Sequence, residues 1–261
     1  MNITQDIKQN GYAVLPNLLS KVDAKILLKE IGGSYTSSDL YVFREDLLKL
    51  FPELVLPIII NSLVLDSAES IMGPFVQLDS ISLVCLPKKS KCELSWHRDP
   101  YGGFPRGSAF QRPLALNLLV YLQDLDNEIG PLRVIPGSHR RKLKIDEKER
   151  NKEHHLEELI FAKTGDGVLI HNNLIHTRSR NTSHLNRYHL SVVYNLSIMK
   201  SVLNTNLPHI KDIITCLNEI GDIRLMRLFG QDAKDIERNN SGFLIEDEIQ
   251  WKRWLDIDRM G

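Results

Sequence analysis

The feature that most constrains the fold is a series of short strand-like segments between residues 76 and 199. These segments are rich in β-formers and are bounded by Gly, Pro, Asn or Asp. In chain order they are VQLDSISLVCL, ELSWHRD, PLALNLLVYLQDL, GPLRVIPGS, DGVLIHN and RYHLSVVYNLS. Little helical pattern separates them, which favours an antiparallel sandwich or barrel over a sheet of βαβ units. The sequence therefore predicts a mainly β core.

Helical patterns flank this core on both sides. Before residue 76, a strand-like GYAVLPN precedes SKVDAKILLKEIG, and 45–72 has largely helical spacing. After residue 200, helical spacing returns in LPHIKDIITCLNEIGDIRLMRLFG and IEDEIQWKRWLDIDRM. Neither flank is rich enough in apolar residues to form its own core. We therefore predict a single domain over 1–261, with an N-terminal strand and helices (1–75), a β core (76–199) and a helical C-terminal extension (200–261).

The composition excludes several classes of function. Lys plus Arg and Asp plus Glu balance at 33 each, so no net field would recruit nucleic acid or an anionic membrane. Three cysteines without a CxxC pair indicate reduced thiols and a cytoplasmic protein. The longest apolar run, Leu54 to Leu65, is interrupted by polar residues and is short for a membrane span, so we expect a buried element. We expect a small-molecule substrate, with no nucleic-acid or membrane partner. The oligomeric state is left open.

A candidate metal-binding pair lies in the segment SWHRD. His97 and Asp99 are two residues apart, so in a strand both side chains would point to one face. Such a pair and a distant histidine make the facial triad of non-haem iron enzymes, which leaves one face of the ion open. On its own the pair is a weak signal, because such tripeptides are frequent and a chance arrangement on a solvated strand end is the commoner explanation.

A second cluster supplies the distant histidine. In GDGVLIHNNLIHTRSRNTSHLNRYHLSVVYN, His176 lies in a connecting stretch and Arg187 begins the next strand. A guanidinium there could bind the far carboxylate of 2-oxoglutarate, which chelates iron through its 2-oxo acid end. Alternatively, Arg187 pairs with a surface acid, and His171 competes with His176 for the metal. His184 and His189 are interpreted as ordinary polar histidines.

At these residues the sequence resembles the phytanoyl-CoA dioxygenase family. Besides WHRD, the resemblance rests on GYAVLPNLLS, on LNLLVYLQDLDNEIGPLRVIPGSHR and on HTRSRNTSHLNR, which follow one another in the family's order. It covers roughly residues 8 to 199. It implies a double-stranded β-helix (a jelly-roll, cupin-like core), iron(II) as cofactor, and 2-oxoglutarate and O2 as cosubstrates. It places His97, Asp99 and His176 at the metal and Arg187 at the 2-oxoglutarate, with no further catalytic residue. His139, in the Pro-Gly-Ser-His motif, is expected in a turn that shapes the sheet.

The resemblance also suggests where the substrate binds. The loop after the metal pair contains Tyr101, Phe104 and Arg106, which could form a lid, although a plain connecting loop is equally compatible. Arg178 stands where several relatives carry a small residue, and it could contact an anion or the substrate. Asp99 fills the position that iron halogenases leave to chloride, which favours hydroxylation. Trp251 and Trp254 are expected to form a packing face.

The predicted function is therefore hydroxylation of an unactivated C–H bond of a small molecule in biosynthesis, with decarboxylation of 2-oxoglutarate to succinate. Three alternatives remain. One is a cupin-like metalloenzyme that does not use 2-oxoglutarate, for which Arg187 would have no purpose. Another is a non-catalytic binding module on the same barrel, and the third is a zinc hydrolase with the same ligands. The substrate, and the choice among hydroxylation, desaturation, cyclisation and epimerisation, are left open.

Overall fold

The computed structural model describes residues 2–32, 41–43, 47–90, 95–99, 112–242 and 244–260. The chain divides into two compact units. Unit 1 comprises Met1–Glu45 with Ser82–Ser191, and unit 2 comprises Asp46–Ile81 with Val192–Gly261. Two long strands, β3 (Val76–Leu86) and β9 (Arg187–Leu196), each run from one unit into the other. The expectation of a single domain remains a prediction.

Unit 1 holds most of the β-structure. Its helical elements are α1 (Ile3–Asn10), α2 (Lys21–Gly32) and the 3-10 helices η1 (Ser138–Arg140) and η2 (Glu147–Glu149). Its strands, besides parts of β3 and β9, are β1 (Tyr12–Leu15), β2 (Tyr41–Phe43), β4 (Ala115–Tyr121), β5 (Leu132–Val134), β6 (Glu158–Ile160), β7 (Gly167–His171) and β8 (His176–Arg178).

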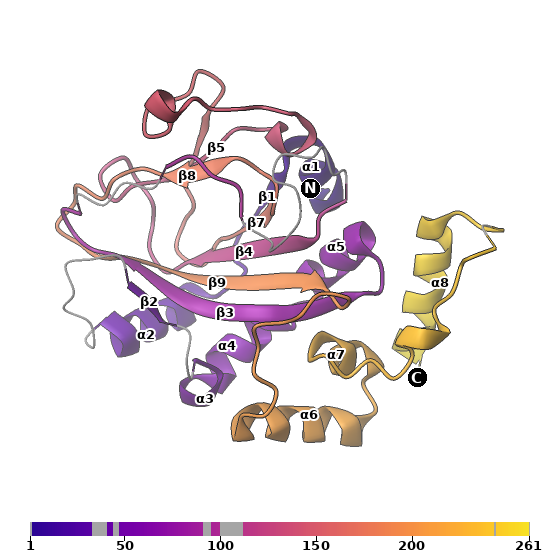
Figure 1. Cartoon of the computed structure of the whole chain (residues 1–261). Coiled ribbons are helices and arrows are strands. Elements are labelled where there is room, and N and C mark those ends of the chain that lie inside the picture. Colours follow the sequence, from indigo (N-terminus) through magenta and orange to yellow (C-terminus); the bar gives the residue numbers. More distant parts are fainter. Residues whose placement is uncertain are drawn as a thin grey trace. The chain divides into compact units, whose positions relative to one another are not determined.

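The strands form two antiparallel sheets (Figure 1). The large sheet has the order β1-β7-β4-β9-β3-β2, and the small one has the order β6-β5-β8. Apolar side chains from β4 and β7 of the large sheet pack in one buried cluster with side chains from β5 and β6 of the small sheet. A chain with two facing sheets over one core is a β-sandwich. The prediction of a mainly β fold with flanking helices is confirmed.

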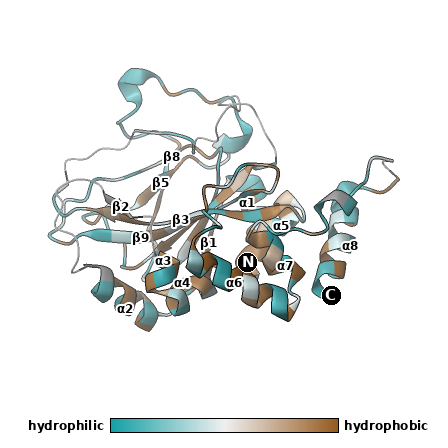
Figure 2. Ribbon diagram, turned by 60° about the horizontal axis from the view of Figure 1, so that its bottom comes forward, coloured by the Kyte–Doolittle hydropathy of each residue, from teal (hydrophilic) through white to brown (hydrophobic). Residues whose placement is uncertain are grey.

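The register of the small sheet determines which side chains face this core. Val134 on β5 lies opposite His176 on β8, and Arg133 lies opposite Thr177. Because side chains alternate along a strand, His176 points to the same face as the buried Val134, and Thr177 points to the other face. The charged excursion that follows β5 lies outside this packing, and η2 within it is hydrophilic (Figure 2).

Three features differ from the sequence prediction. Helix α1 was not expected; Asn2 caps its start by accepting a hydrogen bond from the amide of Gln5, and Gly11 ends it in the left-handed conformation. The segment SWHRD is not a regular strand in its described part, residues 95–99, but makes one isolated bridge between His97 and His176. His176 in turn lies within β8, whereas a connecting stretch was expected. A strand of three residues is too short to show alternation.

Unit 2 is helical apart from its strand ends. Its helices are α3 (Leu47–Leu50), α4 (Pro52–Ile59), α5 (Ser62–Met72), α6 (Pro208–Ile220), α7 (Ile223–Leu228), the 3-10 helix η3 (Asp235–Glu237) and α8 (Asp247–Met260). By length and composition alone, Pro52–Met72 could cross a membrane. However, the helix is broken between α4 and α5, and 50% of the stretch is buried. Core helices of this kind pass the same test, so the stretch is weak evidence for a membrane span.

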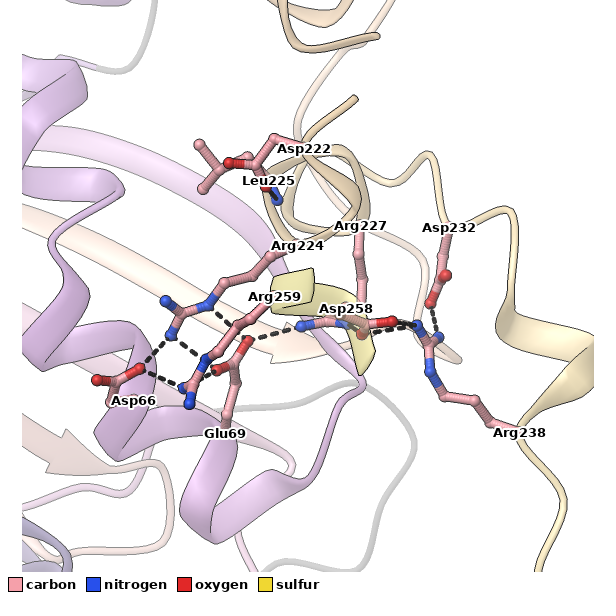
Figure 3. A network of polar contacts seen from close by, with 10 residues as sticks. All are labelled: Asp66, Glu69, Asp222, Arg224, Leu225, Arg227, Asp232, Arg238, Asp258 and Arg259. Carbon is pink, nitrogen blue, oxygen red and sulfur yellow. Dashed lines mark hydrogen bonds and ion pairs between the residues drawn. The ribbon is translucent and has the colours of Figure 1, made fainter. Parts of the chain in front are cut away.

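A network of buried ion pairs connects the helices of unit 2 (Figure 3). Glu69 on α5 accepts hydrogen bonds from Arg224, at 2.7 and 3.0 Å, and from Arg227, at 2.6 Å. Arg227 also bonds Asp258 on α8, which in turn accepts from Arg238. Helix α8 also makes an aromatic contact. The Trp254 ring lies edge-on to that of Phe75, with 6.4 Å between the ring centroids. The C-terminal helix is thus attached to α5 and α7 by charge and to Phe75 by ring packing.

Candidate metal centre

Two chain segments meet at the candidate metal centre. The amide of His97 donates to the carbonyl of His176 and the amide of His176 donates back, both at 3.0 Å. Two residues on, the amide of Asp99 donates to the carbonyl of Asn172 at 3.0 Å. These backbone bonds bring residues 97–99 beside β8, so side chains nearly eighty positions apart in sequence converge.

The three predicted ligands lie together. Asp99 Oδ1 is 3.9 Å from His97 Nε2 and 3.6 Å from His176 Nε2, and the ligand atoms all lie within 4.8 Å of one another. Two ligand atoms at right angles around one ion are about 3 Å apart, so small side-chain adjustments would suffice to bind a metal. Within the described ranges, this is the one group of three or more His, Cys, Asp or Glu with such spacing.

The orientation of both imidazoles suits metal binding. His97 Nδ1 lies 2.9 Å from the carbonyl of Ser95, and His176 Nδ1 lies 3.0 Å from the carbonyl of Leu174. A carbonyl can only accept, so each Nδ1 must carry the proton, which leaves the Nε2 lone pair directed at the third ligand. Burial, and then the neighbouring His176, lower the pKa of His97 to about 4, so this ring is neutral near pH 7. Neutral imidazole is the form that binds metal.

The Asp99 carboxylate is held from its other side. Asn117 on β4 donates from its amide to Asp99 Oδ2 at 3.4 Å, and its own Oδ1 accepts from the hydroxyl of Ser191 at 2.8 Å. Oδ2 is therefore engaged, while Oδ1 faces the two histidines. This arrangement favours binding through one oxygen, which keeps more positions open on the ion.

Arg187 begins β9 and is buried, with 2% of its surface exposed. One guanidinium nitrogen donates to the carbonyl of Gly130, and Nε has no partner among the described residues. Burial lowers the pKa of Arg187 to about 10, and within the described chain no carboxylate offsets that effect. A buried guanidinium without an acid is costly unless an anion binds it. Arg187 is therefore suited to bind the carboxylate of a ligand.

The remaining residues singled out in the sequence are not part of the group of three ligands. His171 does not join the centre, because its ring lies 4.8 Å from that of His139. His184 is exposed in the turn before β9, as expected of an ordinary polar histidine. Arg178 lies two residues after His176 on β8, and its positive charge contributes to lowering the pKa of both His97 and Arg187. The lid candidates Tyr101, Phe104 and Arg106 lie outside the described residues.

The sequence interpretation missed several polar residues around this centre. His189, expected to be an ordinary polar histidine, is buried, its ring lies 5.5 Å from that of Tyr121, and burial lowers its pKa well below 6.5. Strand alternation places Arg187, His189 and Ser191 on one face of β9, and Asn117 and Tyr121 on one face of β4. That alternation is visible in the sequence, and it could have identified these residues once Arg187 was chosen.

A facing pair of sheets with a His-Asp-His group at the small sheet, together with a buried arginine, is the arrangement expected of a non-haem iron oxygenase that uses 2-oxoglutarate. The chain belongs to the phytanoyl-CoA dioxygenase family, whose family model matches residues 51–188. The protein is thus a 2-oxoglutarate-dependent dioxygenase, with iron(II) as cofactor and 2-oxoglutarate and O2 as cosubstrates, as the sequence resemblance implied.

Individual relatives agree with this assignment. The chain is 23% identical over 223 residues to L-proline trans-4-hydroxylase from Streptomyces griseoviridis, covering 72% of this chain and 83% of that protein. HygX from Streptomyces hygroscopicus, solved with nickel, 2-oxoglutarate and hygromycin B, has a TM-score of 0.63 at 15% identity, over 76% of this chain and 88% of that one. The epimerase SnoN from nogalamycin biosynthesis, solved with Fe3+, 2-oxoglutarate and nogalamycin RO, has a TM-score of 0.56 at 17% identity, over 80% of this chain and 87% of that one. These structural likenesses confirm the jelly-roll core.

Proposed function

We propose that this protein hydroxylates an unactivated C–H bond of a small molecule, with His97, Asp99 and His176 holding iron(II) and Arg187 binding the distal carboxylate of 2-oxoglutarate. The observation that carries the proposal is the buried guanidinium of Arg187, which has no carboxylate partner in the described chain. A cupin-like enzyme without 2-oxoglutarate would have no cosubstrate carboxylate for such a group to bind.

In this proposal, the triad binds the metal, and Arg187 orients the cosubstrate. The triad would occupy one face of the ion and leave adjacent positions for the cosubstrate and dioxygen. Arg187 would orient 2-oxoglutarate by a charge-assisted contact, and Asn117 would keep Asp99 in place. Iron(II) with 2-oxoglutarate and O2 supplies the oxidant for the C–H bond, so that R–H, 2-oxoglutarate and O2 become R–OH, succinate and CO2. No acid or base of the chain is needed for that step.

Hydroxylation is proposed on two grounds, of which the second argues against halogenation alone. The relative found by sequence is a hydroxylase that acts on L-proline, and Asp99 fills the ligand position that halogenation would need open. The relatives described above are a hydroxylase of L-proline, a protein solved with hygromycin B and an epimerase from nogalamycin biosynthesis. We therefore propose a biosynthetic small molecule as substrate. Because Cys85 and Cys216 are free thiols, we also propose that the protein works in the reducing cytoplasm.

The test is an anaerobic spectroscopic titration of metal-free protein with iron(II) and then 2-oxoglutarate. We expect a weak visible charge-transfer band only when both are present, and its loss in Asp99→Ala and Arg187→Ala. His184→Ala is the matched control, because His184 is an exposed histidine in the turn that precedes Arg187. A wild-type protein that binds iron(II) but shows no band would refute the 2-oxoglutarate assignment. Succinate release in the presence of candidate substrates then identifies the substrate class.

A further inference from the structure

Arg98 lies between two proposed ligands, and among the described residues its side chain donates to main-chain carbonyls. Its Nε donates to the carbonyl of Asn173 at 2.8 Å, and one terminal nitrogen donates to the carbonyls of Ser138, at 3.0 Å, and Arg141, at 3.1 Å. One side chain thereby joins the segment of His97 and Asp99 to two other segments.

Ser138 makes the complementary connection. Its side chain is fully buried, and its hydroxyl accepts a hydrogen bond at 2.8 Å from the amide of Ile175, the residue directly before His176. The amide of Ile135 also donates to the carbonyl of Ile175 at 2.9 Å. Gly137, at φ 72°, provides the left-handed turn that brings Ser138 to this position. The Pro-Gly-Ser turn therefore lies against the residue preceding the distal ligand.

These contacts form a closed ring of hydrogen bonds that includes the backbone of two proposed metal ligands, His97 and His176. Arg98 bonds the carbonyl of Ser138, and the hydroxyl of Ser138 bonds the amide before His176. The ring is completed by the reciprocal backbone bonds of His97 and His176. Since residues 95–99 form no regular strand in the described chain, sheet pairing alone supplies few bonds to fix their place. The hydrogen bond from Arg98 to the carbonyl of Ser138 therefore holds residues 95–99 in place where a regular strand would use backbone hydrogen bonds.

We propose that Arg98 and Ser138 are positioning residues that set the separation between the His97–Asp99 pair and His176, and with it the affinity and ligand field of the metal. The proposal rests on the metal ligands proposed above. Arginine suits this task because its planar fork presents several donors in fixed directions, which lysine cannot reproduce. The proposal also gives a role to the Pro-Gly-Ser-His motif, which the chemistry of the centre had not used.

The test compares Arg98→Met, Arg98→Lys and Ser138→Ala with Arg140→Met. Arg140 is the matched control, because it lies in the same turn and donates to a main-chain carbonyl, that of Gln9 at 2.9 Å, away from the metal. We measure cobalt(II) affinity and its visible ligand-field spectrum without 2-oxoglutarate, and the melting temperature of the metal-free protein. We expect the dissociation constant of the metal to rise about 10- to 100-fold in Arg98→Met, with a shifted spectrum. Arg98→Lys and Ser138→Ala should lie between Arg98→Met and the wild type.

Each outcome decides the question. If Arg98→Met melts lower but binds cobalt(II) with the wild-type affinity and spectrum, the contact is merely structural and the proposal is wrong. The same holds if Arg140→Met changes the spectrum as much as Arg98→Met does. If Arg98→Met does not fold, an unchanged spectrum in both Arg98→Lys and Ser138→Ala overturns the proposal. Failure of the metal assignment itself is distinguishable, because then wild type and His176→Ala would bind cobalt(II) equally.

Discussion

Arg187→Met should have opposite effects on the metal-free protein and on the complex with 2-oxoglutarate. Methionine matches the length and apolar stem of arginine but carries no charge. In the folded protein, burial lowers the pKa of Arg187 from 12.5 to about 10, which corresponds to about 3 kcal/mol of unfavourable burial of the charge. Because the folded-state pKa lies below the unfolded-state value, this cost is present in full at every pH below about 10.

The variant removes this cost and also one hydrogen bond, to the carbonyl of Gly130, worth about 1 kcal/mol. The metal-free variant should therefore be more stable by about 1–2 kcal/mol, a rise of about 2–8 °C in melting temperature for a unit of this size. The complex should suffer the reverse. Two charge-assisted hydrogen bonds to a carboxylate contribute about 3–6 kcal/mol, so the dissociation constant of 2-oxoglutarate should rise about 10²- to 10⁴-fold.

Both effects are measurable on one preparation. Urea unfolding of the metal-free protein gives the free energy of unfolding, and titration of the iron(II) protein under argon gives the dissociation constant of 2-oxoglutarate. The affinity for iron(II) alone serves as the control and should not change. A variant that unfolds more easily yet binds 2-oxoglutarate as the wild type does would refute the reasoning, because Arg187 would then be part of the scaffold rather than an anion site.

Three further changes test other parts of the structure. Glu69→Gln, which deprives buried Arg227 of a charged partner, should cost about 3–5 kcal/mol in urea unfolding; adding Arg227→Met should recover part of the loss, and a cost near zero would contradict the ion-pair argument. Burial lowers the pKa of His139 to about 4 and of His171 to about 3, both below the usual 6.5, so the unfolded chain takes up protons first and stability should fall as the pH decreases below about 6.5. His171→Gln should reduce that slope by up to about 1.4 kcal/mol per pH unit, and an unchanged slope would show that the buried ring is not responsible. Gly130→Ala should lower the melting temperature and weaken 2-oxoglutarate binding. At φ +89° the new Cβ would lie 2.6 and 2.7 Å from two backbone oxygens, and the resulting shift would displace the Gly130 carbonyl that accepts from Arg187. Normal cosubstrate affinity in this variant would show that the carbonyl is dispensable.

Long elements with strong periodicity could be predicted from the sequence. The segment 76–86 was expected as one strand and forms β3 with the same bounds, and RYHLSVVYNL forms β9. Helix α1 escaped prediction because its short pattern is dominated by polar residues. Strands β6 and β8 escaped because each has only three residues and lacks the Gly-Pro and Pro-Gly pairs that flank the equally short β5. Their pairing with β5 depends on partners more than twenty residues away.

The candidate ligands converge through backbone hydrogen bonds rather than through strand alternation. Strand alternation was expected to align His97 with Asp99, but their described segment makes only an isolated bridge. The residues meet because the backbone bonds of His97 and Asp99 attach to 172–176, and because Arg98 and Ser138 fasten the same two segments. Chemical identity thus pointed to the ligands without the correct geometry. The supporting residues have no such signature, since an arginine that bonds carbonyls has the same side chain as one on the surface, and only the fold distinguishes the two.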